Sequence, residues 1–152
     1  MNSLKKNIVK IPDSSEGNFV IKYFPNWSIP YLHLSRADRP TGTWLLLLPC
    51  LFGILLACIE KNNFSISFYE IWLLIACSIG AFLMRGAGCT WNDILDKDYD
   101  AKVKRTQNRP IPSGQVTIRR AIYWMIVQSL LAFTILLTFN KFSILIACLS
   151  LL

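Results

Sequence analysis

Charge is missing from four long stretches of this 152-residue chain. No Asp, Glu, Lys or Arg occurs in residues 43–59, 71–84, 121–139 or 142–152. The second stretch stays apolar to Trp91, with Arg85 as its single charge. A helix needs about 20 apolar residues to cross a bilayer core. We therefore predict an all-α, polytopic membrane protein with three full spans, at about 43–59, 71–91 and 121–139, and the start of a fourth at 142–152.

Basic residues are scarce in two of the connecting segments and abundant in the others. Of the 16 Lys and Arg residues, 13 precede the first span or lie between the second and third. This positive-inside distribution predicts that the N-terminus and the 92–120 loop are cytoplasmic, and it argues against nucleic acid as the partner of a chain with net charge +7. Residues 1–30 lack the apolar core of a signal peptide, and we interpret them as a mostly loose, polar cytoplasmic leader before a domain at 31–152.

Residues typical of metal centres and disulfides are few. None of the five cysteines forms a CxxC pair, and all lie in or beside apolar runs, so we expect small buried side chains and no disulfide framework. The single histidine, His33, lies near the start of the first span. We interpret it as an amphipathic surface residue rather than as a ligand.

Four aspartates are concentrated in NDILDKDYD, residues 92–100, directly after the second apolar run. If the helix of that span continues through them, Asp93, Asp96 and Asp100 fall within an arc of roughly 60° on one face. Asn92 lies at the edge of this stripe and Asp98 on the far side. Carboxylates so close together repel, and Mg²⁺ would relieve that repulsion while leaving positions for substrate phosphate. We predict a magnesium site here.

The aspartates allow two other interpretations. An EF-hand calcium loop requires glycine where Ala101 stands and a bidentate glutamate where Gln107 stands, so it is disfavoured. A solvated acidic helix end remains open, because charged residues are common at membrane edges.

A basic loop follows the aspartates and contains Lys102, Lys104, Arg105 and Arg109. Arginine and lysine suit phosphate oxygens, so acids, metal and bases together indicate a diphosphate site. The alternative is that the loop serves topology alone. Arg85 lies about three helical turns before Asp96 on the same face, and a charge within a span usually faces a functional cavity or a partner.

These residues carry a family resemblance. RADRPTGTWLLLLPC and MRGAGCTWNDILDKDYDAKVKRTQNRPIPSG resemble the UbiA superfamily of intramembrane prenyltransferases, in which NDxxDxxxD is the first aspartate-rich motif. The match is closest to the members that act on 4-hydroxybenzoate. It implies half of a nine-helix fold, located in a bacterial inner membrane or a mitochondrial inner membrane.

The resemblance also implies a reaction. A polyprenyl group would pass from its diphosphate, bound through Mg²⁺, to an aromatic acid, with 4-hydroxybenzoate of ubiquinone biosynthesis as the first expectation. Another acceptor, such as haem or a different quinone precursor, and an inactive membrane fragment are the alternatives. The residue roles that follow are catalysis by Asp93, Asp96 and Arg85; substrate binding by Arg36, Asn92, Lys102, Arg105 and Arg109; and metal binding by Asn92, Asp93, Asp96 and Asp100.

The chain departs from this family in one respect. Acidic residues are absent after Asp100, so the second aspartate-rich motif of the family is missing. We expect this to be the N-terminal half of the enzyme, with a separately encoded C-terminal half as its candidate partner.

Overall fold

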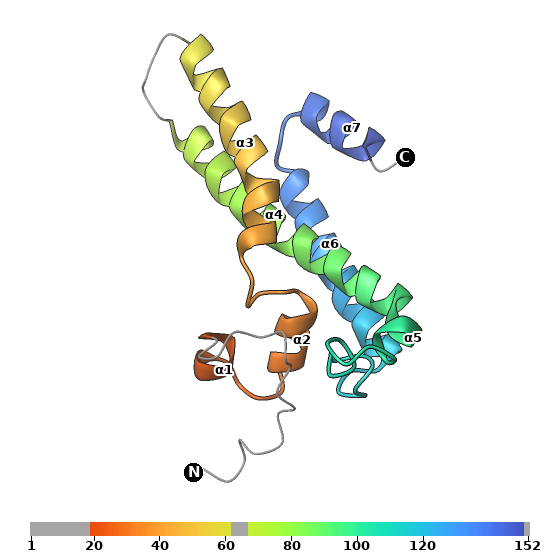
Figure 1. Ribbon diagram of the computed structural model, residues 1–152. Coiled ribbons are helices and arrows are strands. Elements are labelled where there is room, and N and C mark those ends of the chain that lie inside the picture. Colours follow the sequence, from red (N-terminus) through yellow and green to blue (C-terminus); the bar gives the residue numbers. More distant parts are fainter. Residues whose placement is uncertain (1–18, 62–66, 151–152) are drawn as a thin grey trace. The chain divides into compact units, whose positions relative to one another are not determined.

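A computed structural model describes residues 19–61 and 67–150, and all regular structure within these ranges is α-helical (Figure 1). In chain order the helices are α1 (Phe19–Tyr23), α2 (Ile29–Leu34), α3 (Thr41–Glu60), α4 (Phe68–Leu95), α5 (Lys97–Asp100), α6 (Ile118–Leu136) and α7 (Lys141–Leu149). The all-α prediction is confirmed. Residues 1–18 of the predicted leader lie outside the described residues, and the described end of that leader is partly helical rather than loose, since it forms α1 and begins α2.

Within the described residues, three helices are long and apolar enough to cross a bilayer, which confirms the three predicted full spans. They are α3 with 20 residues, α4 with 28 and α6 with 19. At about 1.5 Å per residue, α4 exceeds the roughly 30 Å of a hydrocarbon core. Its polar C-terminal end can therefore stand at the membrane surface while the rest remains in lipid. The nine residues of α7 are too few to span.

Large apolar side chains cover α3 on nearly all sides, and many are exposed. In water such a surface would be a liability, whereas in a bilayer it contacts lipid. The exposed residues of this helix are Trp44, Leu45, Leu46, Leu48, Phe52, Leu55, Leu56 and Ile59.

The chain divides into two compact units, and α4 and α6 each contribute a segment to both. The first unit comprises residues 1–40 and 86–127, and the second comprises 41–85 and 128–152. The first unit has a small apolar core formed by Leu34 of α2, Ile111 and Val116 of the 101–117 loop, and Ala121 of α6. This core fixes the loop against the two helices.

Trp124 of α6 ties α2 into the first unit. Its indole Nε1 donates a hydrogen bond to Ser35 Oγ over 2.9 Å, and its ring contacts that of Tyr31 with centroids 5.5 Å apart. Ser35 directly precedes Arg36, so this contact positions a predicted site residue.

The second unit contains a capped helix start at α4. Glu70 accepts a hydrogen bond from the Ser67 N–H over 2.9 Å, and Ser67 Oγ accepts one from the Tyr69 N–H over 3.1 Å. This reciprocal pattern is a variant of the capping box, and it satisfies donors that the first turn leaves open. Lys61 Nζ lies 2.7 Å from the same Glu70 carboxylate, so the acidic side chain in the first turn of α4 is neutralised by an ion pair.

The link between Ser35 and Trp124 generates a stability prediction. Ser35→Ala and Trp124→Phe should each destabilise the chain by about 1 kcal/mol, and the double variant should lose much less than their sum because one hydrogen bond is shared. Unfolding by SDS in bicelles, followed by circular dichroism, measures this coupling. Trp91→Phe, at an exposed tryptophan of α4, should change little. Strict additivity of the two changes would contradict the link.

Candidate functional site

Arg36 is held in place by the way α2 ends. Its N–H donates to the His33 carbonyl over 3.1 Å, and the Ala37 N–H donates to the Leu32 carbonyl over 3.0 Å. These two bonds define a Schellman helix end, in which the residue after the cap adopts the left-handed conformation. Arg36 occupies that position with φ of 53°. Glycine is usual there, and an L-residue costs roughly 1 kcal/mol. The chain therefore accepts backbone strain to put an arginine at this point.

Two arginines and two aspartates, Arg36, Asp93, Asp100 and Arg109, form a connected cluster in the first unit. Arg36 Nη2 lies 2.7 Å from Asp93 Oδ1, and Arg109 Nη1 lies 3.3 Å from the same oxygen. Arg109 Nη1 also lies 2.7 Å from Asp100 Oδ2. Both aspartates are buried, with Asp93 only 2% exposed. We call these four residues the arginine–aspartate cluster.

The loop after α5 is folded so that Arg109 reaches this cluster. Thr106 Oγ1 donates to the Asp100 carbonyl over 3.0 Å, and the Val116 N–H donates to the Pro110 carbonyl over 2.9 Å. Gly114 turns the chain with φ of 75°, a conformation that glycine adopts without strain. The loop is thus closed by its own hydrogen bonds.

Two polar atoms of the cluster are buried without a hydrogen-bond partner among the described residues, and these are Asp93 Oδ2 and Arg109 Nε. Buried polar atoms in proteins nearly always form a hydrogen bond, so two buried atoms without one are unusual. One is an anionic oxygen and the other a cationic donor. An anionic oxygen suits a metal ion, and a cationic donor suits an anion.

The predicted aspartate stripe is only partly observed. The prediction of one helix through residues 92–100 is wrong, because α4 ends at Leu95 and α5 begins at Lys97. Asp96 stands between them and is exposed, as is Asn92. Across residues 19–61 and 67–150, no three His, Cys, Asp or Glu side chains gather as a metal site. The buried members of the stripe, Asp93 and Asp100, face arginines instead.

The other predicted basic residues do not join the cluster. Lys102 and Arg105 are exposed on the loop, and neither forms an ion pair within the described part of the chain. Arg85 belongs to the second unit, where its guanidinium lies against Gly42 so closely that a Cβ at position 42 would displace it. Arg85 Nε is buried without a hydrogen-bond partner among the described residues. A charged group so placed is suited to receive an anion.

His33 is not the surface residue that the sequence suggested. It is buried, and its Nδ1 lies 3.8 Å from Asp38 Oδ1. Burial acts to raise the pKa of Asp38, but interaction with His33 and the charge of Arg39 outweigh it and hold that pKa below its usual value. Asp38 was not among the predicted site residues. Its position two residues after Arg36 was the only signal that could have drawn attention to it.

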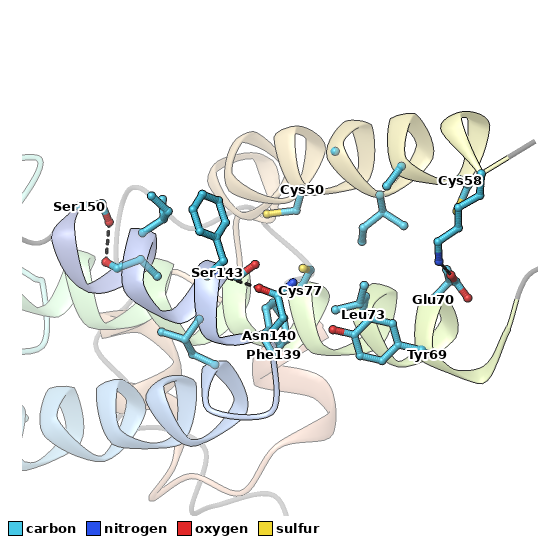
Figure 2. A pocket seen from close by; sticks show the side chains of 18 residues that line it. Cys50, Cys58, Tyr69, Glu70, Leu73, Cys77, Phe139, Asn140, Ser143 and Ser150 are labelled. Atoms are coloured by element: carbon cyan, nitrogen blue, oxygen red, sulfur yellow. Dashed lines mark hydrogen bonds and ion pairs between the residues drawn. The ribbon is translucent and has the colours of Figure 1, made fainter.

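A separate open cavity of about 580 Å³ lies in the second unit, lined by α3, α4, α7 and the turn before α7 (Figure 2). The two ionic groups in its wall, Lys61 and Glu70, neutralise each other. Figure 2 shows the thiols of Cys50 and Cys77 pointing into the same space. The remaining lining is mainly apolar, so the cavity suits a hydrocarbon chain rather than a charged ligand.

Comparison with known proteins identifies the family. The model of the UbiA prenyltransferase family matches residues 46–152, which is well over half of the chain. The chain belongs to the UbiA prenyltransferase family. This confirms the resemblance that NDILDKDYD and its flanking residues suggested.

Several curated relatives of this UbiA-family chain share a name. Proteins named "4-hydroxybenzoate polyprenyltransferase, mitochondrial" are 43% identical to it over 88% of the chain in Rattus norvegicus, 47% over 76% in Homo sapiens, and 36% over 94% in Schizosaccharomyces pombe. These alignments cover 34%, 30% and 38% of the relatives, so the chain spans about a third of their length. No solved structure matches the chain.

The strained backbone at Arg36 gives a prediction with an internal comparison. Both Arg36→Ala and Arg36→Gly remove the ion pair with Asp93, but only glycine relieves the left-handed conformation. The glycine variant should therefore be more stable than the alanine variant by about 1 kcal/mol in an SDS unfolding titration. At Arg39, whose φ is not positive, glycine should offer no such advantage. Equal stability of the two Arg36 variants would contradict the assigned conformation.

Proposed function

We propose that this chain carries the first diphosphate-binding half of an aromatic prenyltransferase, which transfers a polyprenyl group from its diphosphate to 4-hydroxybenzoate. The observation that carries the proposal is the arginine–aspartate cluster, in which Asp93 Oδ2 and Arg109 Nε are buried with no hydrogen-bond partner among the described residues. The names of the relatives support the acceptor and, with it, a place in ubiquinone biosynthesis.

The reaction calls for the charges that the cluster contains. The C–O bond to the diphosphate breaks and the leaving group keeps the electron pair, which leaves an allylic cation. The ring carbon ortho to the hydroxyl then forms the new C–C bond and loses its proton. Negative charge grows on the diphosphate as the bond breaks, and preorganised cationic donors stabilise that charge. Arg109 is the strongest candidate for this role, because two ion pairs orient its guanidinium.

The arginine–aspartate cluster suits a Mg²⁺ ion whose ligands come mainly from the diphosphate of the substrate. Magnesium usually takes one or two protein carboxylates and completes its shell with water and phosphate, so a site of three carboxylates is unnecessary. We assign Asp93 through its open Oδ2, together with Asn92 and Asp96, to the metal, with Asp100 supporting the site through Arg109. When bound, the ion would neutralise the developing charge on the diphosphate.

The remaining bases take supporting roles in the proposal. Lys102 and Arg105 lie exposed on the loop, where they can cover a bound diphosphate. Arg36 already contacts Asp93, so we assign it to the diphosphate side of the site. We assign Arg85, whose Nε has no hydrogen-bond partner among the described residues, to the carboxylate of the acceptor or to the diphosphate.

The proposal places the chain in a bacterial or mitochondrial inner membrane, with the 92–120 loop on the cytoplasmic or matrix side. Relatives named as mitochondrial and the basic residues of that loop support this. Because the chain spans about a third of its relatives, the complete reaction requires the rest of such a protein.

A chimera tests the function directly. Residues 31–152 would replace the aligned part of the Rattus norvegicus relative, and membranes would be given 4-hydroxybenzoate, a polyprenyl diphosphate and Mg²⁺. We expect prenylated product that disappears with EDTA. Asp93→Asn should lower kcat/KM by roughly 100-fold, because it removes the charge that faces both arginines and the metal.

The matched control is Asp98→Asn, at an exposed aspartate of the same motif. Its kcat/KM should stay within about twofold of the parent chimera. A fully active Asp93→Asn chimera would sink the metal assignment. If a well-folded chimera prenylates another quinone precursor instead, the assigned acceptor is wrong. If it makes no product at all, the assigned activity is wrong.

A further inference from the structure

Three exposed aromatic side chains lie within five residues at the end of α1 and just after it. They are Tyr23, 72% exposed, Phe24, 43% exposed, and Trp27, 76% exposed. Single exposed apolar residues are ordinary, but a group of three large rings marks a surface that is covered by something other than water. We call these residues the aromatic surface.

The depth of this segment follows from its contact with a membrane helix of the same unit. Tyr31 packs on Trp124 and Ser35 accepts a hydrogen bond from it, and Trp124 lies in the second turn of α6. Since α6 is long and apolar enough to cross the bilayer, its first turns stand at the boundary between headgroups and acyl chains. Helix α2, and the chain that leads into it, lie at the same boundary.

An open apolar groove of about 460 Å³ adjoins the aromatic surface. Trp124 forms one side of it, while the remaining wall comes from the α1–α2 connection and the start of α2. The lining residues are Phe24, Pro25, Trp27, Ser28, Tyr31, Leu32 and Trp124. Its shape and its lack of charged groups suit a section of acyl chain.

The charge and ring chemistry of residues 19–32 also match a membrane boundary. Lys22 is the one charged side chain among them, and its Nζ lies 5.3 Å from the centre of the Tyr23 ring. Tyrosine and tryptophan combine an apolar body with a polar group and concentrate at membrane interfaces, and lysine can extend its amine to lipid headgroups.

We propose that residues 19–32 rest on the bilayer interface, with Tyr23, Phe24 and Trp27 in the headgroup–acyl boundary and an acyl chain in the adjoining groove. The docked segment holds α2 level with the start of α6, and α2 in turn carries Arg36. A second copy of the chain or another protein could instead cover the aromatic surface. Neither alternative explains why Tyr31 and Ser35 contact Trp124 at the start of a helix long enough to cross the membrane.

Fluorine NMR of the whole chain in lipid nanodiscs tests this. The five tryptophans would be labelled with 5-fluorotryptophan, and the Trp27 signal would be assigned by its loss in Trp27→Phe. We expect lipid spin-labelled near the glycerol end to broaden Trp27 more than lipid labelled at the chain end or an aqueous gadolinium chelate. Strongest broadening by gadolinium would place the ring in water, and no broadening by any of these agents would show a protein cover. Either outcome overturns the proposal.

A second measurement separates docking from folding. Trypsin cleavage after Lys22 should be slow in nanodiscs and should accelerate roughly tenfold in Trp27→Ser, because the segment would leave the lipid more often. Tyr99→Ser, at an equally exposed ring outside the aromatic surface, is the control and should leave the rate unchanged. Unchanged cleavage in Trp27→Ser would also contradict docking.

Discussion

The ion pairs between Arg109 and the carboxylates of Asp93 and Asp100 are the interaction on which the first unit depends. A buried carboxylate at the end of a membrane helix is costly unless an opposite charge meets it, and two of them close together repel each other as well. Arg109 meets both. To do so, the loop after α5 must fold back, and the hydrogen bonds of Thr106 and Val116 hold it there. The apolar core of the unit lies beneath this fold.

Arg36, which precedes the first span in the sequence, also neutralises the carboxylate of Asp93. Arg36 adopts the left-handed backbone conformation at the end of α2. The hydrogen bond between Ser35 and Trp124 stabilises the chain next to it. The result is a site in which two arginines and two aspartates balance each other in charge. One carboxylate oxygen and one guanidinium nitrogen are buried with no hydrogen-bond partner in the described part of the chain. In the proposed function, an anion that arrives with a metal would meet these arginines, whose guanidinium groups suit phosphate oxygens as well as aspartate.

Parts of this arrangement were predictable from sequence because they rest on local physics. Three long apolar stretches, one of them interrupted by Arg85, gave the spans. The break at Asp96 was not predictable, since the spacing of the aspartates fits a continuous helix equally well and only the fold of the following loop decides. The burial of His33 depends on packing that an alternation of polar and apolar residues does not reveal. The Ser35–Trp124 bond joins residues 89 positions apart, and no periodicity or motif announces it.

Binding of a prenyl diphosphate to the chain itself tests the central claim most directly. Farnesyl diphosphate would be titrated with Mg²⁺ into the chain in nanodiscs and followed by ³¹P NMR, comparing Arg109→Met with Arg119→Met, which changes an exposed arginine outside the cluster. If the arginine–aspartate cluster holds the diphosphate, the Arg109 variant should lose about tenfold or more in affinity while the Arg119 variant binds as the parent does. Equal binding by the two variants would contradict the account.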